Sequence, residues 1–202
     1  MVWLIGSQGL LGSRVLELLK EKNIPYLCTN SEVDISNLQS LEDLAKNNPI
    51  DWIINCAAYT KVEKAETERA RAYEVNALGP KNLGLISSQF GCNVLHISTD
   101  YVFDGMTEHP LPEEQPTNPL NWYGSTKLAG EKFLIQETSR AVVLRTAWLY
   151  DHRGKNFYTT MTGRFRNGQA VRVVNDQTGC PTWAYELAQA SLSIITARKL
   201  ST

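Results

Sequence analysis

The chain has 202 residues, of which 43% are hydrophobic and 20% charged, and its formal net charge at pH 7 is −1. This length suits one sizeable domain with a small appendage, and the composition is that of an ordinary globular protein. The balance of acidic and basic residues lacks the excess positive charge typical of nucleic-acid binders. Apolar runs such as Trp52–Ala58 are too short to cross a bilayer, and no basic stretch followed by an apolar one opens the chain. We therefore expect a cytoplasmic protein with neither a nucleic-acid nor a membrane partner.

The four cysteines are widely spaced and form no C-x-x-C pair: Cys28, Cys56, Cys92 and Cys180. Three of them lie in or beside apolar runs, where a cysteine usually behaves as a small buried hydrophobe. The three histidines do not stand at zinc-ligand spacing either. The sequence therefore predicts reduced thiols and no metal site.

Short apolar runs alternate along the chain with segments of helical periodicity, a pattern typical of βαβ units around a parallel sheet. The predicted strands are Val2–Ile5, Pro25–Thr29, Trp52–Cys56, Asn93–Ser98, Ala141–Arg145 and Val171–Val174. The predicted helices are Leu10–Glu21, Asn37–Asn47, Arg69–Phe90, Tyr123–Glu137, Asn156–Arg166 and Tyr185–Ala197. Because the first five strands are apolar at nearly every position, we expect helices on both faces of a doubly wound, Rossmann-like α/β sheet. Residues 1–150 would form a dinucleotide-binding domain, and residues 151–202 would supply part of a substrate lobe and the last sheet elements.

A glycine-rich turn follows the first predicted strand and opens the first predicted helix. Its spacing is G-x-x-G-x-x-G, with Gly6, Gly9 and Gly12. Glycines permit a tight strand-to-helix turn and close approach of the backbone to a pyrophosphate, and the helix N-terminus offers free N–H groups. Turns collect glycine for structural reasons alone, but this position favours dinucleotide binding.

The end of the second predicted strand, Cys28–Glu32, carries no acidic residue directly at the strand end and no arginine. An acid there would hydrogen-bond a ribose 2′-hydroxyl and repel a 2′-phosphate, so both NADPH and NADH stay open. Asp34 either holds the adenine side of the cofactor or caps the helix that begins at Asn37. Small residues after the third strand, including Ala57 and Ala58, either leave room for a cofactor at the sheet edge or serve plain packing.

A tyrosine and a lysine one helical turn apart, Tyr123 and Lys127, follow a strand-end motif that contains Thr99. Reduction of a ketone by hydride requires a proton for the developing alkoxide, and a free phenol has a pKa near 10. A neighbouring ammonium would lower the pKa of Tyr123 and hold the nicotinamide ribose, and Thr99 would polarise the carbonyl. A surface tyrosine beside a solvated lysine is the alternative, but the glycine turn upstream favours catalysis.

Several longer motifs together resemble the dTDP-4-dehydrorhamnose reductase family of extended short-chain dehydrogenases. They are Gly6–Gly12, Asn55–Thr60, Ser98–Gly105, Tyr123–Glu131, Arg145–Tyr150, Asn156–Phe157 and Asn175–Thr182. The resemblance spans nearly the whole chain. It implies reduction of the C4 ketone of dTDP-4-dehydro-L-rhamnose with NADPH or NADH, and a nucleotide-sugar substrate.

The resemblance also implies roles for individual residues. Tyr123 would be the proton donor and Lys127 its partner, Thr99 and Asp100 would contact the sugar, and Trp148 would pack on it. The cofactor would be lined by Gly9, Leu10, Leu11, Asp34, Ile35, Ala57, Ala58 and Tyr59, in addition to Gly6, Gly12, Tyr123 and Lys127. For Trp148, core packing after a strand is the alternative interpretation.

Two departures from the family pattern change what the resemblance implies. Members continue for roughly another hundred residues, so most of the small C-terminal substrate lobe is expected to be missing here. Some members bind magnesium between subunits through glutamates, and Arg14 and Tyr185 stand at two of those positions. The chain is therefore expected to bind no metal, while a homodimer remains open.

Two other functions compete with the reductase. Nucleotide-sugar epimerases and dehydratases share the glycine turn and the Tyr–Lys pair, but dehydratases need an acidic pair where Asp100 is followed by Tyr101. The third hypothesis is a non-catalytic, cofactor-binding regulator. It is suggested by the β-subunit of methionine adenosyltransferase, a regulatory protein that resembles the same family. Thr99, Tyr123 and Lys127 favour catalysis, whereas the short C-terminal part favours the regulator.

Overall fold

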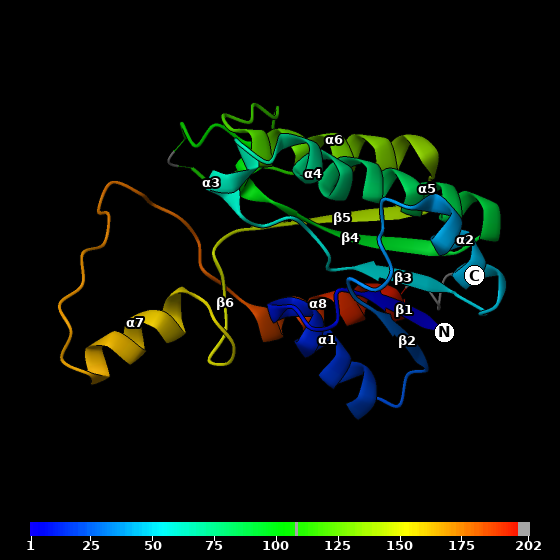
Figure 1. The fold of residues 1–202 in the computed structure, drawn as a ribbon, viewed down its shortest axis with the longest axis horizontal. Coiled ribbons are helices and arrows are strands. Elements are labelled where there is room, and N and C mark those ends of the chain that lie inside the picture. Colours follow the sequence, from blue (N-terminus) through cyan, green and yellow to red (C-terminus); the bar gives the residue numbers. More distant parts are fainter. Residues whose placement is uncertain (108, 198–202) are drawn as a thin grey trace.

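The computed structural model describes residues 1–107 and 109–197, whose core is a five-stranded parallel sheet. The strands lie in the order β2-β1-β3-β4-β5 (Figure 1). Their bounds are β1 Val2–Ile5, β2 Tyr26–Thr29, β3 Trp52–Asn55, β4 Asn93–Thr99 and β5 Ala141–Thr146. Two strand progressions run outward from β1, toward β2 and toward β3, so the doubly wound, Rossmann-like sheet is confirmed.

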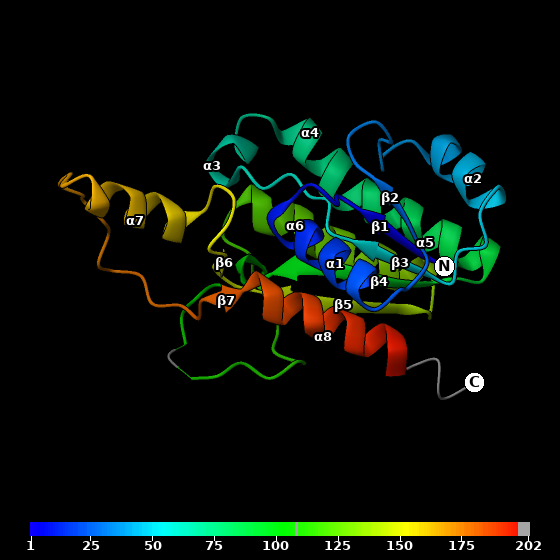
Figure 2. The same ribbon diagram turned by 90° about the horizontal axis from the view of Figure 1, so that it is seen from below.

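Helices cover both faces of this sheet, as Figures 1 and 2 show. α1 (Leu10–Glu21) and α8 (Ala184–Ala197) pack together on one face. The other face carries α2 (Leu38–Lys46), α5 (Gly79–Phe90) and α6 (Trp122–Glu137). Side chains of a strand alternate between faces, so Val2 and Leu4 belong to the core under α1 and α8, while Trp3 and Ile5 belong to the core under α2 and α5. Two buried faces explain why the strands are continuously apolar.

The helix predicted over Arg69–Phe90 is helical from end to end, but its hydrogen-bond pattern is not uniform. It consists of α4 (Arg69–Tyr73), the π-helical η1 (Glu74–Leu78) and α5. Pro80 lies in the first turn of α5 and has no N–H to donate to the carbonyl of Asn76 four residues earlier. That carbonyl faces α6, where a Cβ on Gly130 would lie 2.1 Å from it. The regular hydrogen-bond ladder is therefore interrupted at the point where α6 approaches most closely.

The strand predicted over Val171–Val174 is also wrong, because this stretch is irregular and Val173 and Val174 are exposed. A short parallel pair forms elsewhere, between β6 (Leu149–Tyr150) and β7 (Thr182–Trp183). An apolar run becomes a strand only where a neighbour accepts its backbone hydrogen bonds, and none of the described strands lies beside Val171–Val174. Asn37 and Asn156, predicted as first helical residues, are instead the N-caps of α2 and of α7 (Phe157–Arg166).

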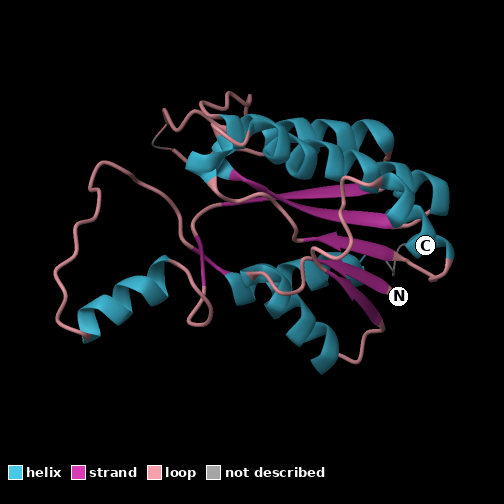
Figure 3. Cartoon of the chain, viewed as in Figure 1, coloured by secondary structure: helices cyan, strands magenta, loops and turns pink. Residues whose placement is uncertain are grey.

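The helix α7 (Phe157–Arg166) stands apart from the layered body and is joined to it by long loops, as the cartoon in Figure 3 shows. None of its residues is buried. Two short helical turns, α3 (Val62–Ala65) and η2 (Asp100–Val102), follow β3 and β4. Within the described ranges, no helix is long and apolar enough to span a membrane.

Candidate functional site

A cavity of about 980 Å³ opens at the carboxyl ends of the central strands. This is where ligands bind in open parallel sheets. Its walls include every site residue predicted from the sequence except Gly12: Gly6, Gly9, Leu10, Leu11, Asp34, Ile35, Ala57, Ala58, Tyr59, Thr99, Asp100, Tyr123, Lys127 and Trp148. The fold thus brings together residues that are up to 142 positions apart in the chain, from Gly6 to Trp148.

The glycine turn lies between β1 and α1, and its three glycines have different structural roles. Gly6 has a φ of +80°, a conformation that side chains rarely adopt, and a Cβ there would lie 2.9 Å from the amide nitrogen of Ala57. A Cβ on Gly12 would lie 2.1 Å from the Gly6 carbonyl oxygen, so Gly12 allows α1 to approach the turn without itself reaching the cavity. Gly9 is the N-cap of α1 and supplies no capping side chain, which leaves N–H groups of the first turn available to a ligand.

Asn30, at the end of β2, fixes the glycine turn and was missed by the sequence reasoning. Its Oδ1 atom accepts hydrogen bonds from the Gln8 amide, at 3.0 Å, and from the Ser7 hydroxyl, at 3.1 Å. Asn30 also lines the cavity. Its position at a strand end, facing the turn, is the signal that could have found it.

The residues of the cavity fit a dinucleotide. The glycine turn offers backbone donors for a pyrophosphate, and two buried hydroxyl oxygens on the cavity wall, those of Ser98 and Thr146, have no hydrogen-bond partner among the described residues. Buried polar atoms without a partner are costly, so a ligand with polar groups would complete them. Neither hydroxyl was singled out from the sequence.

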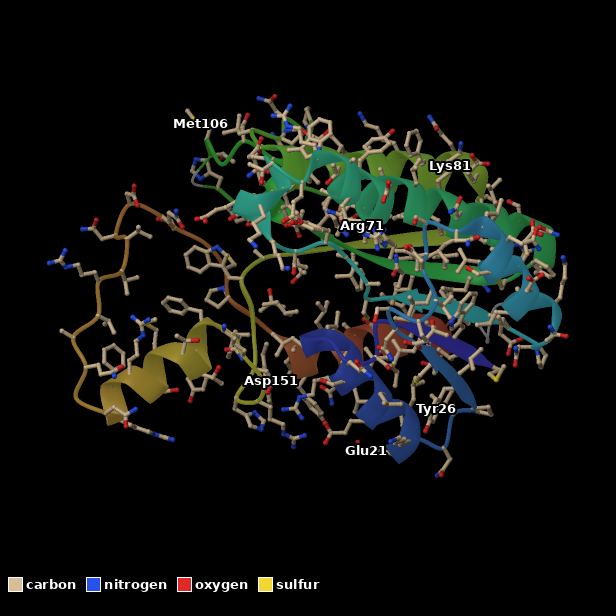
Figure 4. The ribbon with its side chains drawn as sticks, in the orientation of Figure 1. Glu21, Tyr26, Arg71, Lys81, Met106 and Asp151 are labelled. Carbon is tan, nitrogen blue, oxygen red and sulfur yellow. The ribbon has the colours of Figure 1, made fainter. Side chains whose placement is uncertain are left out.

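Asp34 does not cap α2, and that interpretation is wrong. Its carboxylate accepts hydrogen bonds from the amide and hydroxyl of Ser36 and pairs with Arg71 of α4 at 3.1 Å. Hydrogen bonds from Ser36 hold the pKa of this carboxyl below its usual range, and Arg71 adds to the effect. Figure 4 labels Arg71 among the side chains above the sheet, and it shares the cavity wall with Asp34. The neighbouring Ile35 is largely a core residue, since Gly79 packs against its side chain.

The segment after β3 is held by two buried asparagines. Asn55 accepts a hydrogen bond from the Ala57 amide at 3.1 Å, and Asn76 of η1 both accepts from the Tyr59 amide and donates to the Tyr59 carbonyl. The Tyr59 hydroxyl donates to Glu68 at 2.7 Å. Partial desolvation and this carboxylate raise the pKa of Tyr59 to about 12, so it stays a neutral wall of the cavity.

Tyr123 is buried in the first turn of α6, whose N-cap Asn121 accepts from the Gly124 amide at 2.7 Å. Its ring meets that of Tyr101 edge-on, with centroids 5.5 Å apart. Burial raises the pKa of Tyr123, while a hydrogen bond with Thr99 works in the opposite direction. The net direction differs from the lowering expected from a nearby ammonium, and it keeps the phenol protonated at neutral pH.

Lys127 shares the inner face of α6 with Tyr123 but points its amine at β4. Nζ donates to the carbonyl of Ile97 at 2.7 Å and lies 3.3 Å from Nε2 of His96. The side chain is almost fully buried, and desolvation lowers its pKa to about 8, against the opposing influence of Glu131 and Cys56. The amine is thus held by β4.

Trp148 lies just before β6, with its indole half exposed on the cavity wall. Its φ is 45°, a rare conformation for a bulky residue and one that often accompanies a functional position. Gly179 packs against the ring, where a Cβ would lie 2.6 Å from Cε2 of Trp148. Because the indole is half exposed, the core-packing alternative for Trp148 is wrong. The close contact with Trp148 also explains why the Asn175–Thr182 motif has a glycine at position 179.

Arg14 and Tyr185, where metal-binding glutamates were expected in some relatives, form a different arrangement. The Arg14 guanidinium makes two hydrogen bonds of 2.6 Å to the buried carboxylate of Asp151 and lies over the Tyr185 ring, 5.9 Å from its centroid. Figure 4 shows Asp151 beside α1. Throughout the described ranges, no group of three or more acidic, histidine or cysteine side chains could hold a metal ion.

The doubly wound sheet, the glycine turn and the Tyr123–Lys127 pair around one cavity define a short-chain dehydrogenase/reductase with a Rossmann-like, dinucleotide-binding domain. Within that class, the chain belongs to the RmlD substrate-binding domain family, whose sequence profile matches residues 1–202.

Relatives of known activity agree with this family. A dTDP-4-dehydrorhamnose reductase of Mycolicibacterium smegmatis is 39% identical over 193 residues, which cover 94% of this chain and 58% of that protein. A dTDP-4-keto-6-deoxy-D-glucose reductase of Streptomyces niveus is 36% identical over 96% of this chain and 68% of its own length. The chain thus spans between about half and two thirds of the length of such relatives.

Solved structures share the same fold. A dTDP-4-dehydrorhamnose reductase from Clostridium acetobutylicum superposes with a TM-score of 0.93 at 37% identity, over 98% of this chain and 71% of that one. A reductase of the same name from Bacillus anthracis, in complex with NADP, gives a TM-score of 0.93 at 35% identity, over 96% of this chain and 70% of that one.

Proposed function

We propose that this protein reduces the C4 ketone of dTDP-4-dehydro-L-rhamnose to dTDP-L-rhamnose, with NADPH or NADH as hydride donor. The observation that supports this most is that the glycine turn, Thr99, Tyr123 and Trp148 line one cavity. The names of the relatives supply the sugar, and the NADP complex of the Bacillus anthracis relative favours the phosphorylated cofactor.

The residues divide the work between two ends of the cavity. We assign the glycine turn, with Leu10 and Leu11, to the pyrophosphate, and Asp34, Ile35 and the Ala57–Tyr59 segment to the adenosine side. Thr99 and Asp100 contact the sugar, and Trp148 packs against it, since a flat half-exposed indole suits the face of a sugar ring. Lys127 holds the nicotinamide ribose.

A reduced nicotinamide supplies the hydride that reaches C4 of the sugar. Tyr123 then gives its hydroxyl proton to the C4 oxygen as negative charge develops there. The raised pKa of Tyr123 keeps it in the protonated form that this step needs. Thr99, beside Tyr123, stabilises the developing oxyanion through its hydroxyl.

The test is the loss of NADPH absorbance on addition of dTDP-4-dehydro-L-rhamnose, for the wild type and Tyr123→Phe. Removal of the proton donor should lower kcat by about 10²- to 10⁴-fold with little effect on cofactor affinity. Tyr26→Phe, on the exposed face of β2, is the matched control and should keep full activity.

Two outcomes would contradict the proposal. Full activity of Tyr123→Phe would remove this residue from catalysis. A wild type that binds NADPH tightly but reduces none of the sugar would instead favour the cofactor-binding regulator.

A further inference from the structure

The adenosine end of the cavity carries a cation that has no part in the function proposed above. The described part of the cavity wall has five charged side chains: Asp34, Arg71, Asp100, Lys127 and Lys155. Asp100 and Lys127 lie at the sugar end, and Lys155 follows β6 beside the glycine turn, with which it also lines a smaller cavity. Arg71 of α4 is therefore the one cation that the described wall offers to the adenosine half of a cofactor.

Arg71 has hydrogen-bond donors to spare. Its Nη1 atom lies 3.1 Å from Oδ2 of Asp34 and 3.2 Å from Oε2 of Glu74. Nε and Nη2 make no hydrogen bond to the described residues, and the side chain is 49% exposed. The N–H groups of Nε and Nη2 form the fork with which a guanidinium binds two oxygens of one anion. This edge of Arg71 is thus open to a ligand.

The acidic residue at this end, Asp34, already has partners for both of its oxygens. Oδ1 accepts from the amide of Ser36 at 2.9 Å and from its hydroxyl at 2.7 Å, while Oδ2 faces Arg71. In domains that select NADH, an acid hydrogen-bonds the ribose 2′-hydroxyl and repels a 2′-phosphate. Because the charge of Asp34 is paired with a guanidinium and its oxygens are occupied, Asp34 is poorly suited to either task.

The end of β2 adds no negative charge to the described wall. Asn30 and Ser31 line the cavity there, and both side chains are neutral and can donate hydrogen bonds. The carboxylate of Glu32 accepts from the Asn30 amide at 2.6 Å and is not part of the described wall. An anion at this end would therefore meet neutral donors and the open edge of Arg71.

Only one of the two nicotinamide cofactors brings an anion to this place. With the pyrophosphate on the glycine turn, the adenosine ribose lies toward the end of β2. NADPH carries a phosphate on the 2′-oxygen of this ribose, with a charge of about −1.5 to −2 at pH 7, whereas NADH carries a hydroxyl. A guanidinium binds phosphate through paired hydrogen bonds, which a single hydroxyl cannot replace.

We propose that Arg71 is a specificity-determining residue that binds the 2′-phosphate of NADPH, so that the protein uses NADPH in preference to NADH. The inference rests on the proposed function and deepens it. Nη1 of Arg71 neutralises Asp34, and the edge formed by Nε and Nη2 binds the phosphate. Because Arg71 comes from α4, far from β2 in the chain, the residues at the end of β2 do not reveal the preference by themselves.

The first experiment measures the binding of NADPH and NADH without the sugar, through the fluorescence of the reduced nicotinamide. The wild type should bind NADPH at least about tenfold more tightly than NADH. Arg71→Ala should lose about 10- to 100-fold in affinity for NADPH and little for NADH, as expected for hydrogen bonds between charged groups. Arg69→Ala removes the same charge from α4 outside the described cavity wall and should keep both affinities.

Two results of this experiment would overturn the proposal. One is a wild type that binds both cofactors equally well. The other is an equal loss for NADPH and NADH in Arg71→Ala, which is the result expected if the guanidinium only stacks on the adenine.

A second pair of variants separates contact with the phosphate from neutralisation of Asp34. Without Arg71, the Asp34 carboxylate is no longer paired and would itself repel a phosphate. Asp34→Asn removes this repulsion, so the double variant Asp34→Asn, Arg71→Ala is compared with Asp34→Asn alone. Direct contact predicts that the double variant still loses the preference for NADPH. Equal preferences in the two variants would overturn direct contact.

The catalytic readout is the ratio of kcat/KM for NADPH to kcat/KM for NADH with dTDP-4-dehydro-L-rhamnose. In Arg71→Ala this ratio should fall by about the same factor as the ratio of affinities, and an unchanged ratio would overturn the proposal. If the wild type prefers NADPH through Arg71 but reduces none of the sugar, the proposed function fails while the role of Arg71 stands. A wild type that binds neither cofactor would contradict both.

Discussion

The two sides of the cavity are built in different ways. The cofactor side is formed by strand ends and a turn embedded in the sheet, where Gly6 and Gly12 make backbone contacts too close for any side chain. The opposite side includes the segment after β6, with α7 and an exposed loop, and none of the residues of α7 is buried. A site that binds a constant cofactor gains from rigid walls, whereas the substrate side is held by a few local contacts and is freer to vary.

Two ion pairs join α1 to the segment after β6, and loss of the buried one, between Arg14 and Asp151, should have the largest effect on stability. Asp151→Asn removes the buried carboxylate that faces the Arg14 guanidinium and leaves it only the pair with Glu17, and breaking a buried pair costs up to about 3–5 kcal/mol. The free energy of unfolding by denaturant measures this. Arg153→Ala, which removes an exposed pair with Glu17, is the control and should cost less than about 1 kcal/mol. Equal losses in both variants would contradict the prediction that the buried pair stabilises the fold more than the exposed one.

The rigidity of the glycine turn can be broken by a single methyl group. Gly12→Ala places a carbon against the Gly6 carbonyl, and we expect a loss of about 1–3 kcal/mol in stability together with weaker NADPH binding. Thermal unfolding and NADPH fluorescence report the two effects. Gly163→Ala on α7 meets nothing within 4 Å and should be neutral or stabilising, by up to about 1 kcal/mol. A similar loss of stability in Gly12→Ala and Gly163→Ala would contradict the difference in rigidity between the glycine turn and α7.

The ion pair between Arg14 and Asp151 also predicts how the free energy of unfolding depends on pH. Hydrogen bonds from Arg14 hold the folded-state pKa of Asp151 below the unfolded value. Its contribution is therefore fully present above the unfolded pKa, near 4, and is lost as the pH falls through the folded pKa. Unfolding free energies measured from neutral to acidic pH should fall more steeply in the wild type than in Asp151→Asn. Parallel curves would contradict the assignment.

The smallest effect is expected in the loop that was predicted as a strand. Val174→Ser should change the free energy of unfolding by less than about 0.5 kcal/mol, because the side chain is 66% exposed and packs in no core. Val94→Ser, in the buried strand β4, is the matched comparison and should cost several times more. A large fall in the free energy of unfolding of Val174→Ser would contradict the exposed position of this side chain.

Much of the molecule could be predicted from local patterns. The five apolar strands, the glycine turn and the i, i+4 spacing of Tyr123 and Lys127 are written in the sequence, because each depends on neighbours a few residues away. The helix near Asn156 was also predicted, but Asn156 is its N-cap and not its first residue, since its side chain accepts from the Thr159 amide. These features identified the fold class and site residues that, apart from Gly12, all line the cavity, although Asn30 and the hydroxyls of Ser98 and Thr146 were missed.

Tertiary structure decided the rest. Val171–Val174 has the composition of a strand, but none of the described strands lies beside it, and the π-helical turn lies where η1 packs against α6. His96 looked like an ordinary strand residue until the fold set it between Asn55 and Lys127. The physical reason is the same in each case: groups far apart in the sequence decide which backbone groups pair and which polar side chains are buried together.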